Sequence, residues 1–125
     1  MNRVTEQEMT ELLERIQHLM DGSVNVNCNY GQYKVRLRGG QINPKAKYIA
    51  IDSFTQGPDG VSESGNGVFC FVAAEDNHSK AVGTVKKGDI LKCATYKAPA
   101  KHARGSIYDD HKGMKGMAWT GPHYL

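Results

Sequence analysis

The chain has 125 residues, a formal net charge of +3, 39% hydrophobic residues and a mean hydropathy of −0.54. No apolar run approaches the roughly 20 residues that cross a bilayer, which argues against a membrane-spanning protein. The acidic N-terminal segment does not resemble a signal peptide, and three cysteines without C-x-x-C spacing predict free thiols in a reducing cytosol. The length suits a single domain, 1–125, with a modest core.

Charge is divided unevenly along the chain. Residues 1–23 carry two basic and five acidic side chains, whereas residues 86–115 carry eight basic and three acidic ones. A segregated positive region favours an anionic partner. The excess is too small to require duplex nucleic acid.

The first predicted element is an amphipathic helix within residues 1–22. Thr5-Glu6-Gln7-Glu8 has the pattern of a capping box, in which Thr5 and Glu8 each satisfy a free backbone N–H. An apolar stripe then recurs at the helical period and runs from Met9 to Met20. We expect this stripe to pack on the protein's own sheet; the competing interpretation is a homodimer interface.

Residues 23–108 are predicted to hold the sheet. Val24–Cys28 and Tyr33–Leu37 both alternate apolar and polar residues, which predicts a hairpin. The return strand places three cations on one face, and two tyrosines flank it. Such a face suits stacking on bases with phosphate contact, but a solvated edge strand has the same composition. The cations are Lys34, Arg36 and Arg38, and the tyrosines are Tyr30 and Tyr33.

Further strands are expected at Lys47–Phe54, Val68–Val72 and Ile90–Tyr96. The glycine-rich segment Gln56–Gly67 is expected to be a mobile hairpin loop that could act as a lid. The predicted fold is therefore α+β, an antiparallel sheet of about five strands with the first helix packed on it. A Gly-rich tail, 109–125, follows and is anchored by Trp119.

The most informative stretch is Lys92–Tyr108, which contains four Lys or Arg residues and no acid. Pro is favoured at the first helical position and Gly after the last, so Pro99 and Gly105 predict a short basic helix near residues 99–104. Its N-terminus and its cations would suit a phosphate. The alternative is a solvated amphipathic turn. The candidate ligand-binding residues are Tyr96, Lys97, Lys101, His102, Arg104 and Tyr108.

The same stretch resembles a family of small, mostly uncharacterised tailed-phage proteins. The shared features are a strand that ends in Lys-x-Ala-Thr-aromatic, followed by a basic motif, and a tail that closes with Tyr-Leu. The resemblance covers about residues 47–54 and 68–125, and it implies a phage origin rather than an activity. In this chain the features are Lys92-Cys93-Ala94-Thr95-Tyr96, Lys97-Ala98-Pro99-Ala100-Lys101-His102-Ala103-Arg104-Gly105 and Tyr124-Leu125.

Together these patterns predict a phage accessory protein for host takeover or anti-defence, located in the host cytoplasm. It would bind a nucleotide or single-stranded nucleic acid through residues 97–104. The alternative is a protein–protein interaction factor that inhibits a host enzyme. A small phosphodiesterase or nuclease with His102 as general base is a weaker hypothesis. No cofactor is expected, and Asp109-Asp110-His111 is interpreted as a loop rather than a metal site.

Overall fold

The computed structural model describes residues 3–29 and 31–123, and it confirms the α+β class. One helix, α1 (Glu6–Asp21), accompanies a four-stranded antiparallel sheet in the order β1-β2-β3-β6, where about five strands were predicted. The strands of this sheet are β1 (Gln32–Leu37), β2 (Tyr48–Gln56), β3 (Glu63–Ala73) and β6 (Ile90–Leu91). The smaller elements are η1 (Arg38–Gly40), β4 (Asn77–Ser79), β5 (Gly83–Val85), β7 (Met117–Ala118) and β8 (Gly121–Pro122).

Helix α1 begins at the predicted capping box. The Thr5 hydroxyl accepts the Glu8 N–H, and the Glu8 carboxylate accepts the Thr5 N–H at 2.9 Å. The predicted stripe is buried within the chain's own core, since four of its side chains have no exposed surface. Those four residues are thereby unavailable for the homodimer considered from the sequence. They are Met9, Leu12, Ile16 and Met20.

The predicted strand at Val24–Cys28 is wrong, because residues 22–27 form turns after α1. Asn25 is buried, and its amide oxygen accepts the Tyr33 N–H at 2.7 Å while its amide nitrogen donates to the Tyr33 carbonyl at 3.0 Å. A single side chain thus makes the two hydrogen bonds that a neighbouring strand would make there. The alternation of apolar and polar residues in the sequence does not distinguish a neighbouring strand from a turn that places one amide side chain there.

Half of the glycine-rich segment Gln56–Gly67 belongs to strands rather than to a loop. Residues 63–67 belong to β3, and only a tight turn separates β2 from β3. In that turn the Asp59 carboxylate accepts the N–H groups of Val61 and Ser62 at 2.9 Å. The predicted hairpin is therefore present, but its loop is shorter than expected, a turn of residues 57–62 that is held by a carboxylate.

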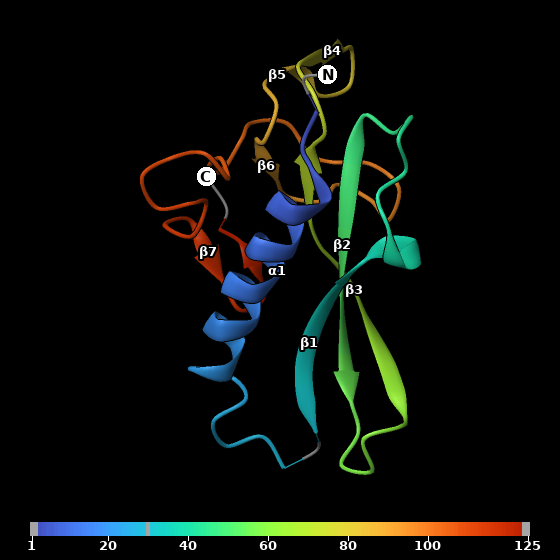
Figure 1. Cartoon of the computed structure of the whole chain (residues 1–125), viewed down its shortest axis with the longest axis vertical. Coiled ribbons are helices and arrows are strands. Elements are labelled where there is room, and N and C mark those ends of the chain that lie inside the picture. The colour runs from blue at the N-terminus through green and yellow to red at the C-terminus, as the bar shows by residue number, and fades with distance from the viewer. Residues whose placement is uncertain (1–2, 30, 124–125) are drawn as a thin grey trace.

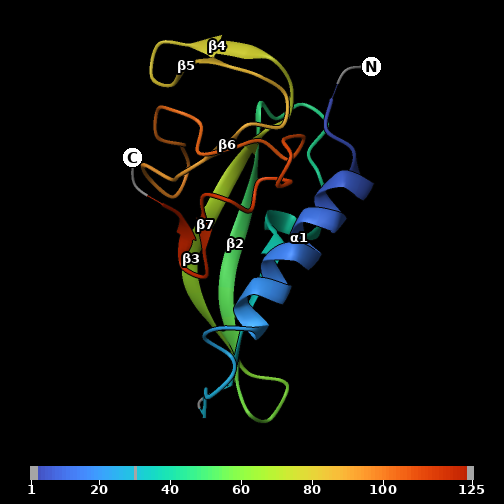
Figure 2. The same ribbon diagram turned by 90° about the vertical axis from the view of Figure 1, so that its left-hand side faces the viewer.

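The two faces of the main sheet are covered by different parts of the chain. Helix α1 and the C-terminal segment pack on the first face, where the Trp119 ring lies edge-on to Tyr33 with centroids 5.2 Å apart. This contact confirms that Trp119 anchors the tail. Figures 1 and 2 show α1 along one side of the sheet and β4 and β5 at one end. The second face carries a smaller cluster: Phe71, Ala73, Val82, Val85 and Leu91.

Within the described residues, no helix combines the length and the apolar character needed to cross a membrane.

Candidate anion-binding cleft

The first half of the basic motif, residues 92–100, folds as a hairpin-like loop. Pro99 pairs with Cys93 in an isolated antiparallel bridge. At the tip of the loop the Thr95 hydroxyl accepts the Lys97 N–H at 3.2 Å. Hydroxyl side chains that bond nearby backbone groups compete with helix formation. Lys97 is therefore presented at the tip of a loop and not on a helix.

The chain after His102 runs antiparallel beside β6. The Arg104 N–H donates to the Ile90 carbonyl at 2.8 Å, and the Ile90 N–H donates to the Gly105 carbonyl at 2.9 Å. His102 itself has a left-handed φ of 72°. A helix would need helical dihedral angles and its own hydrogen-bond pattern at these residues. The predicted short helix over 99–104 is therefore wrong.

The cationic side chains of the motif do not converge. The Arg104 guanidinium turns back and donates to the carbonyls of Lys101 and His102, so it closes its own loop. Lys101 and His102 are exposed. In the described part of the chain the His102 ring has no hydrogen-bond partner, so no carboxylate orients it as a general base.

The two candidate stacking residues lie on opposite sides of the molecule. Tyr96 lies over Arg38 beside the second face, with the guanidinium 3.8 Å from its ring centroid. Tyr108 instead packs near Gly88 and lies close to Glu8 of α1. Burial, together with Glu8, raises the pKa of Tyr108 to about 12. A ligand cannot contact both rings from one site.

Arg38, on the predicted secondary basic face, is held from three directions. Its guanidinium makes two hydrogen bonds to the Asp52 carboxylate, at 3.0 Å and 2.8 Å, and a third to the Tyr96 carbonyl at 2.8 Å. Hydrogen bonding to Asp52 raises the pKa of Arg38 further above its usual value. The contacts fix Arg38 between Asp52 of β2 and the loop that carries Lys97.

The other cations of that face are arranged differently. Arg36 pairs with Glu63 at 2.9 Å and stacks on the Phe54 ring at 4.1 Å, whereas Lys34 has no ion-pair partner among the described residues. The Tyr33 ring is partly buried against the first-face core and in contact with Trp119, away from the cations of the strand's other face. The predicted role of Tyr30 falls outside the described residues. The strand therefore does not offer a row of free cations interleaved with free aromatic rings.

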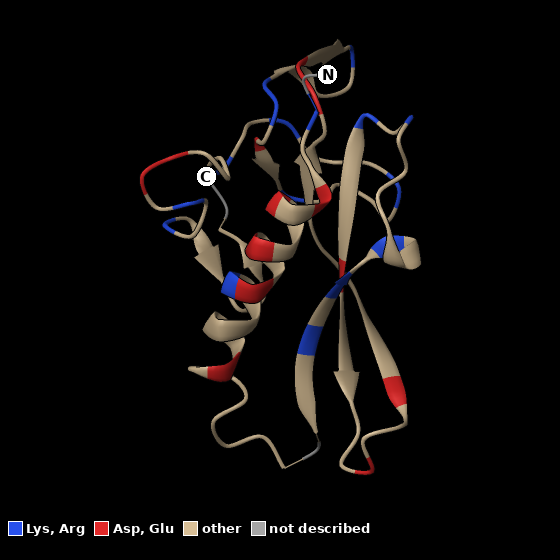
Figure 3. Cartoon of the chain, in the orientation of Figure 1, with Lys and Arg blue, Asp and Glu red and all other residues tan. Residues whose placement is uncertain are grey.

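A cleft of about 380 Å³ brings together cations from three separate segments. Arg38 follows β1, Lys47 precedes β2, and Lys97 lies at the tip of the 92–100 loop. Lys47 and Lys97 are exposed and have no ion-pair partner among the described residues. Figure 3 shows basic positions on β1, η1 and these loops, with acidic positions along α1. The lining residues include no carboxylate: Arg38, Gln41, Asn43, Ala46, Lys47, Tyr48, Ile49, Ala50, Phe71 and Lys97.

Of the residues that line this cleft, the sequence predicted only Arg38 and Lys97 as site residues. Gln41, Asn43, Lys47 and Tyr48 line it, yet the sequence showed only a chain break at residues 39–44 and the start of a strand. The only signal was the exclusion of acids from residues 39–51. That signal does not say that this segment meets Lys97.

Asp109, in the loop that contains Asp109-Asp110-His111, stabilises that loop through hydrogen bonds to its backbone. Its carboxylate accepts the N–H groups of Gly113, Ser106 and His111, and these bonds lower its pKa. Among the described residues no group of three His, Cys, Asp or Glu side chains is placed to hold a metal ion.

No family model, curated protein or solved structure matches the chain. The class of the protein is therefore described from its fold and its cleft alone. It is a small α+β protein with a cationic cleft beside one face of its sheet.

Proposed function

We propose that the protein binds a small phosphate-bearing ligand, a nucleotide in the first instance, in the cleft lined by Arg38, Lys47 and Lys97. The observation that carries the proposal is that Lys47 and Lys97, which have no ion-pair partner among the described residues, converge in one cleft beside Arg38, which is already paired with Asp52. The volume lies within the usual range for small-molecule sites. Clustered cations supply charge-assisted hydrogen bonds to phosphate oxygens.

The neighbouring side chains supply the remaining recognition chemistry. Tyr48 offers a partly exposed ring in the cleft, whereas the Phe71 ring is buried and lies under the Arg38 guanidinium. Gln41 and Asn43 offer amide groups at the edge of the cleft. An aromatic base can stack on the Tyr48 ring, while the amides can hydrogen-bond to its polar edge. The cleft thus contains groups suited to both ends of a nucleotide.

Acidic groups around the arginines favour a small ligand over a nucleic acid strand. Arg36 is already paired with Glu63, and Arg38 with Asp52. A phosphodiester backbone that continued along β1 would approach both carboxylates. Repulsion between like charges would oppose that path.

The biological setting belongs to the same proposal. The basic motif resembles that of small tailed-phage proteins, which supports an accessory role in host takeover or anti-defence, in the host cytoplasm. A protein that sequesters a nucleotide needs a cleft and no catalytic groups. The lack of a hydrogen-bonded partner for the His102 ring among the described residues supports binding over hydrolysis.

A thermal-shift and calorimetry panel tests the proposal with ADP, ATP, inorganic phosphate and a short single-stranded oligonucleotide. We expect stabilisation by ADP or ATP, with affinity reduced about tenfold in each of Lys47→Ala and Lys97→Ala, equivalent to about 1.4 kcal/mol. Lys101→Ala is the matched control, since Lys101 belongs to the same motif but does not line the cleft. A steep salt dependence with the oligonucleotide alone would instead indicate a nucleic-acid binder.

Contact with a host protein is the second candidate function. A shallow apolar hollow of about 450 Å³ lies beside α1, where Leu19 and Met114 are partly exposed. If no probe binds, a host partner purified with the intact protein should be lost with Leu19→Lys and retained with Lys97→Ala. A partner lost with both variants would contradict an interface at this hollow.

A further inference from the structure

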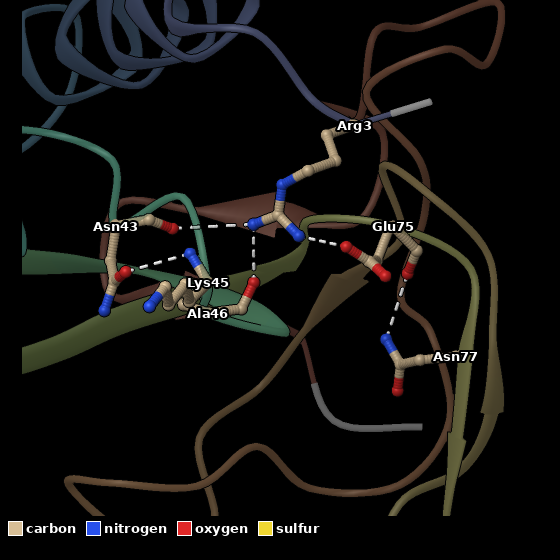
Figure 4. A network of polar contacts seen from close by, with 6 residues as sticks. All are labelled: Arg3, Asn43, Lys45, Ala46, Glu75 and Asn77. Carbon is tan, nitrogen blue, oxygen red and sulfur yellow. Dashed lines mark hydrogen bonds and ion pairs between the residues drawn. The ribbon is translucent and has the colours of Figure 1, made fainter. Parts of the chain in front are cut away.

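Arg3 joins three segments that are far apart in the sequence. Its guanidinium pairs with the Glu75 carboxylate and donates to the carbonyls of Ala46 at 2.7 Å and Asn43 at 3.5 Å. Figure 4 shows the side chain reaching over the turn at 43–46 on one side and towards Glu75 on the other. One planar group thus crosslinks the N-terminal segment, the turn before β2 and the chain after β3.

The turn that Arg3 holds is also an edge of the cationic cleft. Asn43 and Ala46 line the cleft, and Lys47 follows directly. Behind the turn, Gly39 and Gly40 have φ values of 76° and 79°, and a side-chain carbon added to either would meet nothing within 4 Å. In the described part of the chain, Arg3 is the one side chain from a distant element that hydrogen-bonds to the turn.

Glu75 is also connected to the cleft through Asn77 and Tyr48. The Asn77 amide nitrogen donates to the Glu75 carbonyl at 2.9 Å, and the Asn77 amide oxygen accepts the Tyr48 hydroxyl at 3.1 Å. Tyr48 is one of the cleft residues. A disturbance at Arg3 and Glu75 is therefore connected both to the edge of the cleft and to one of its rings.

We propose that Arg3 is a positioning residue that couples the N-terminal segment to ligand binding in the cleft. With Arg3 in place, the turn is fixed and the cleft edge formed by Asn43 and Ala46 is preorganised for the ligand. Without it, this edge loses its tie to the N-terminal segment, whereas the Lys47 carbonyl keeps its hydrogen bond from the Ala74 N–H at 2.9 Å. This inference rests on the proposed function, because it assigns a second role to the edge of the same site.

The physical reason is the geometry of the guanidinium. Its rigid fork can satisfy two carbonyl oxygens and a carboxylate at once, which a lysine ammonium does with poorer geometry. The segment next to it is itself anchored, since Val4 is buried and its N–H donates to the Ala74 carbonyl at 2.8 Å. Preorganisation lowers the entropic cost of binding, so its loss weakens affinity without removing a ligand contact.

Amide hydrogen exchange on the ligand-free protein tests the first half of the inference. The N–H groups of Lys45 and Ala46 bond to Asn43, within the turn. We expect their exchange to accelerate about tenfold in Arg3→Gln, while the Val72 amide in the central strand is unchanged. Equal exchange in the wild type and the variant would overturn the inference.

Calorimetry with ADP tests the coupling itself. We expect Arg3→Gln to weaken ADP binding about tenfold and Arg3→Lys to give an intermediate value. Arg15→Gln is the matched control, because Arg15 is also paired with a carboxylate but lies on α1 away from the cleft. If the wild type binds none of the probes, the proposed function fails. If wild type and Arg3→Gln bind ADP equally, only the positioning role fails.

Discussion

The two faces of the sheet differ in how they use their residues. On the first face, α1 contributes Leu12 and Ile16 to a continuous apolar core that meets Ile51 of β2. On the second face, a smaller apolar cluster gives way to charged and aromatic side chains and a cleft. The first face buries the larger apolar cluster, and the second face carries the cleft.

On the second face, the arginines and the lysines differ in whether a carboxylate already pairs with them. The arginines of β1 and η1 are engaged by Glu63 and Asp52. The lysines that line the cleft have no such partners among the described residues. The arginine guanidinium groups form the ion pairs that hold the site together, whereas the lysine ammonium groups are available to a ligand.

The largest expected effect belongs to the first face. Ile16→Ala should lower the free energy of unfolding by about 2–5 kcal/mol, because Ile16 has no exposed surface and its truncation leaves a cavity. Urea unfolding followed by circular dichroism measures the change. A loss below about 1 kcal/mol would show that α1 is not essential to the core, and the contrast between the faces would disappear.

A smaller loss of stability is expected when the ion pair between Arg38 and Asp52 on the second face is broken. Asp52→Asn should cost about 1–2 kcal/mol, because it removes the charge that holds the partly buried Arg38 guanidinium. The same urea experiment on Glu63→Gln is the control, since that pair is more exposed and should contribute less than about 1 kcal/mol. Equal losses in the two variants would mean that Arg38 is not specially held.

The smallest effect concerns pH and the loop beside the first face. Hydrogen bonds hold the pKa of Asp109 below its ordinary value of 3.8, so the unfolded chain binds the proton more readily. The resulting stability is present above that value and is lost as the pH falls through the lower folded pKa.

Unfolding measured from about pH 6 to about pH 2 should therefore show a shallower acid loss in Asp109→Asn than in the wild type. Asp110→Asn provides the control on the neighbouring carboxylate. Identical acid profiles for wild type and Asp109→Asn would indicate that the loop does not contribute to stability.

Local patterns were enough for elements whose signal lies within a few residues. The capping box at Thr5 and Glu8 correctly predicted the start of α1. The continuous apolar run at Val68–Val72 correctly predicted the central strand. The β2 strand was also predicted, and in the structure Tyr48 and Ala50 face away from Ile49 and Ile51.

The sequence by itself determined the amphipathic helix, the central strands and the α+β class, because each depends on side-chain periodicity within one segment. Only the tertiary structure decided that Asn25 replaces a strand, that residues 99–104 follow β6 instead of forming a helix, and that Lys47 and Lys97 line one cleft. The reason is that a backbone N–H takes the best partner the whole fold offers, and that partner can come from a distant part of the chain.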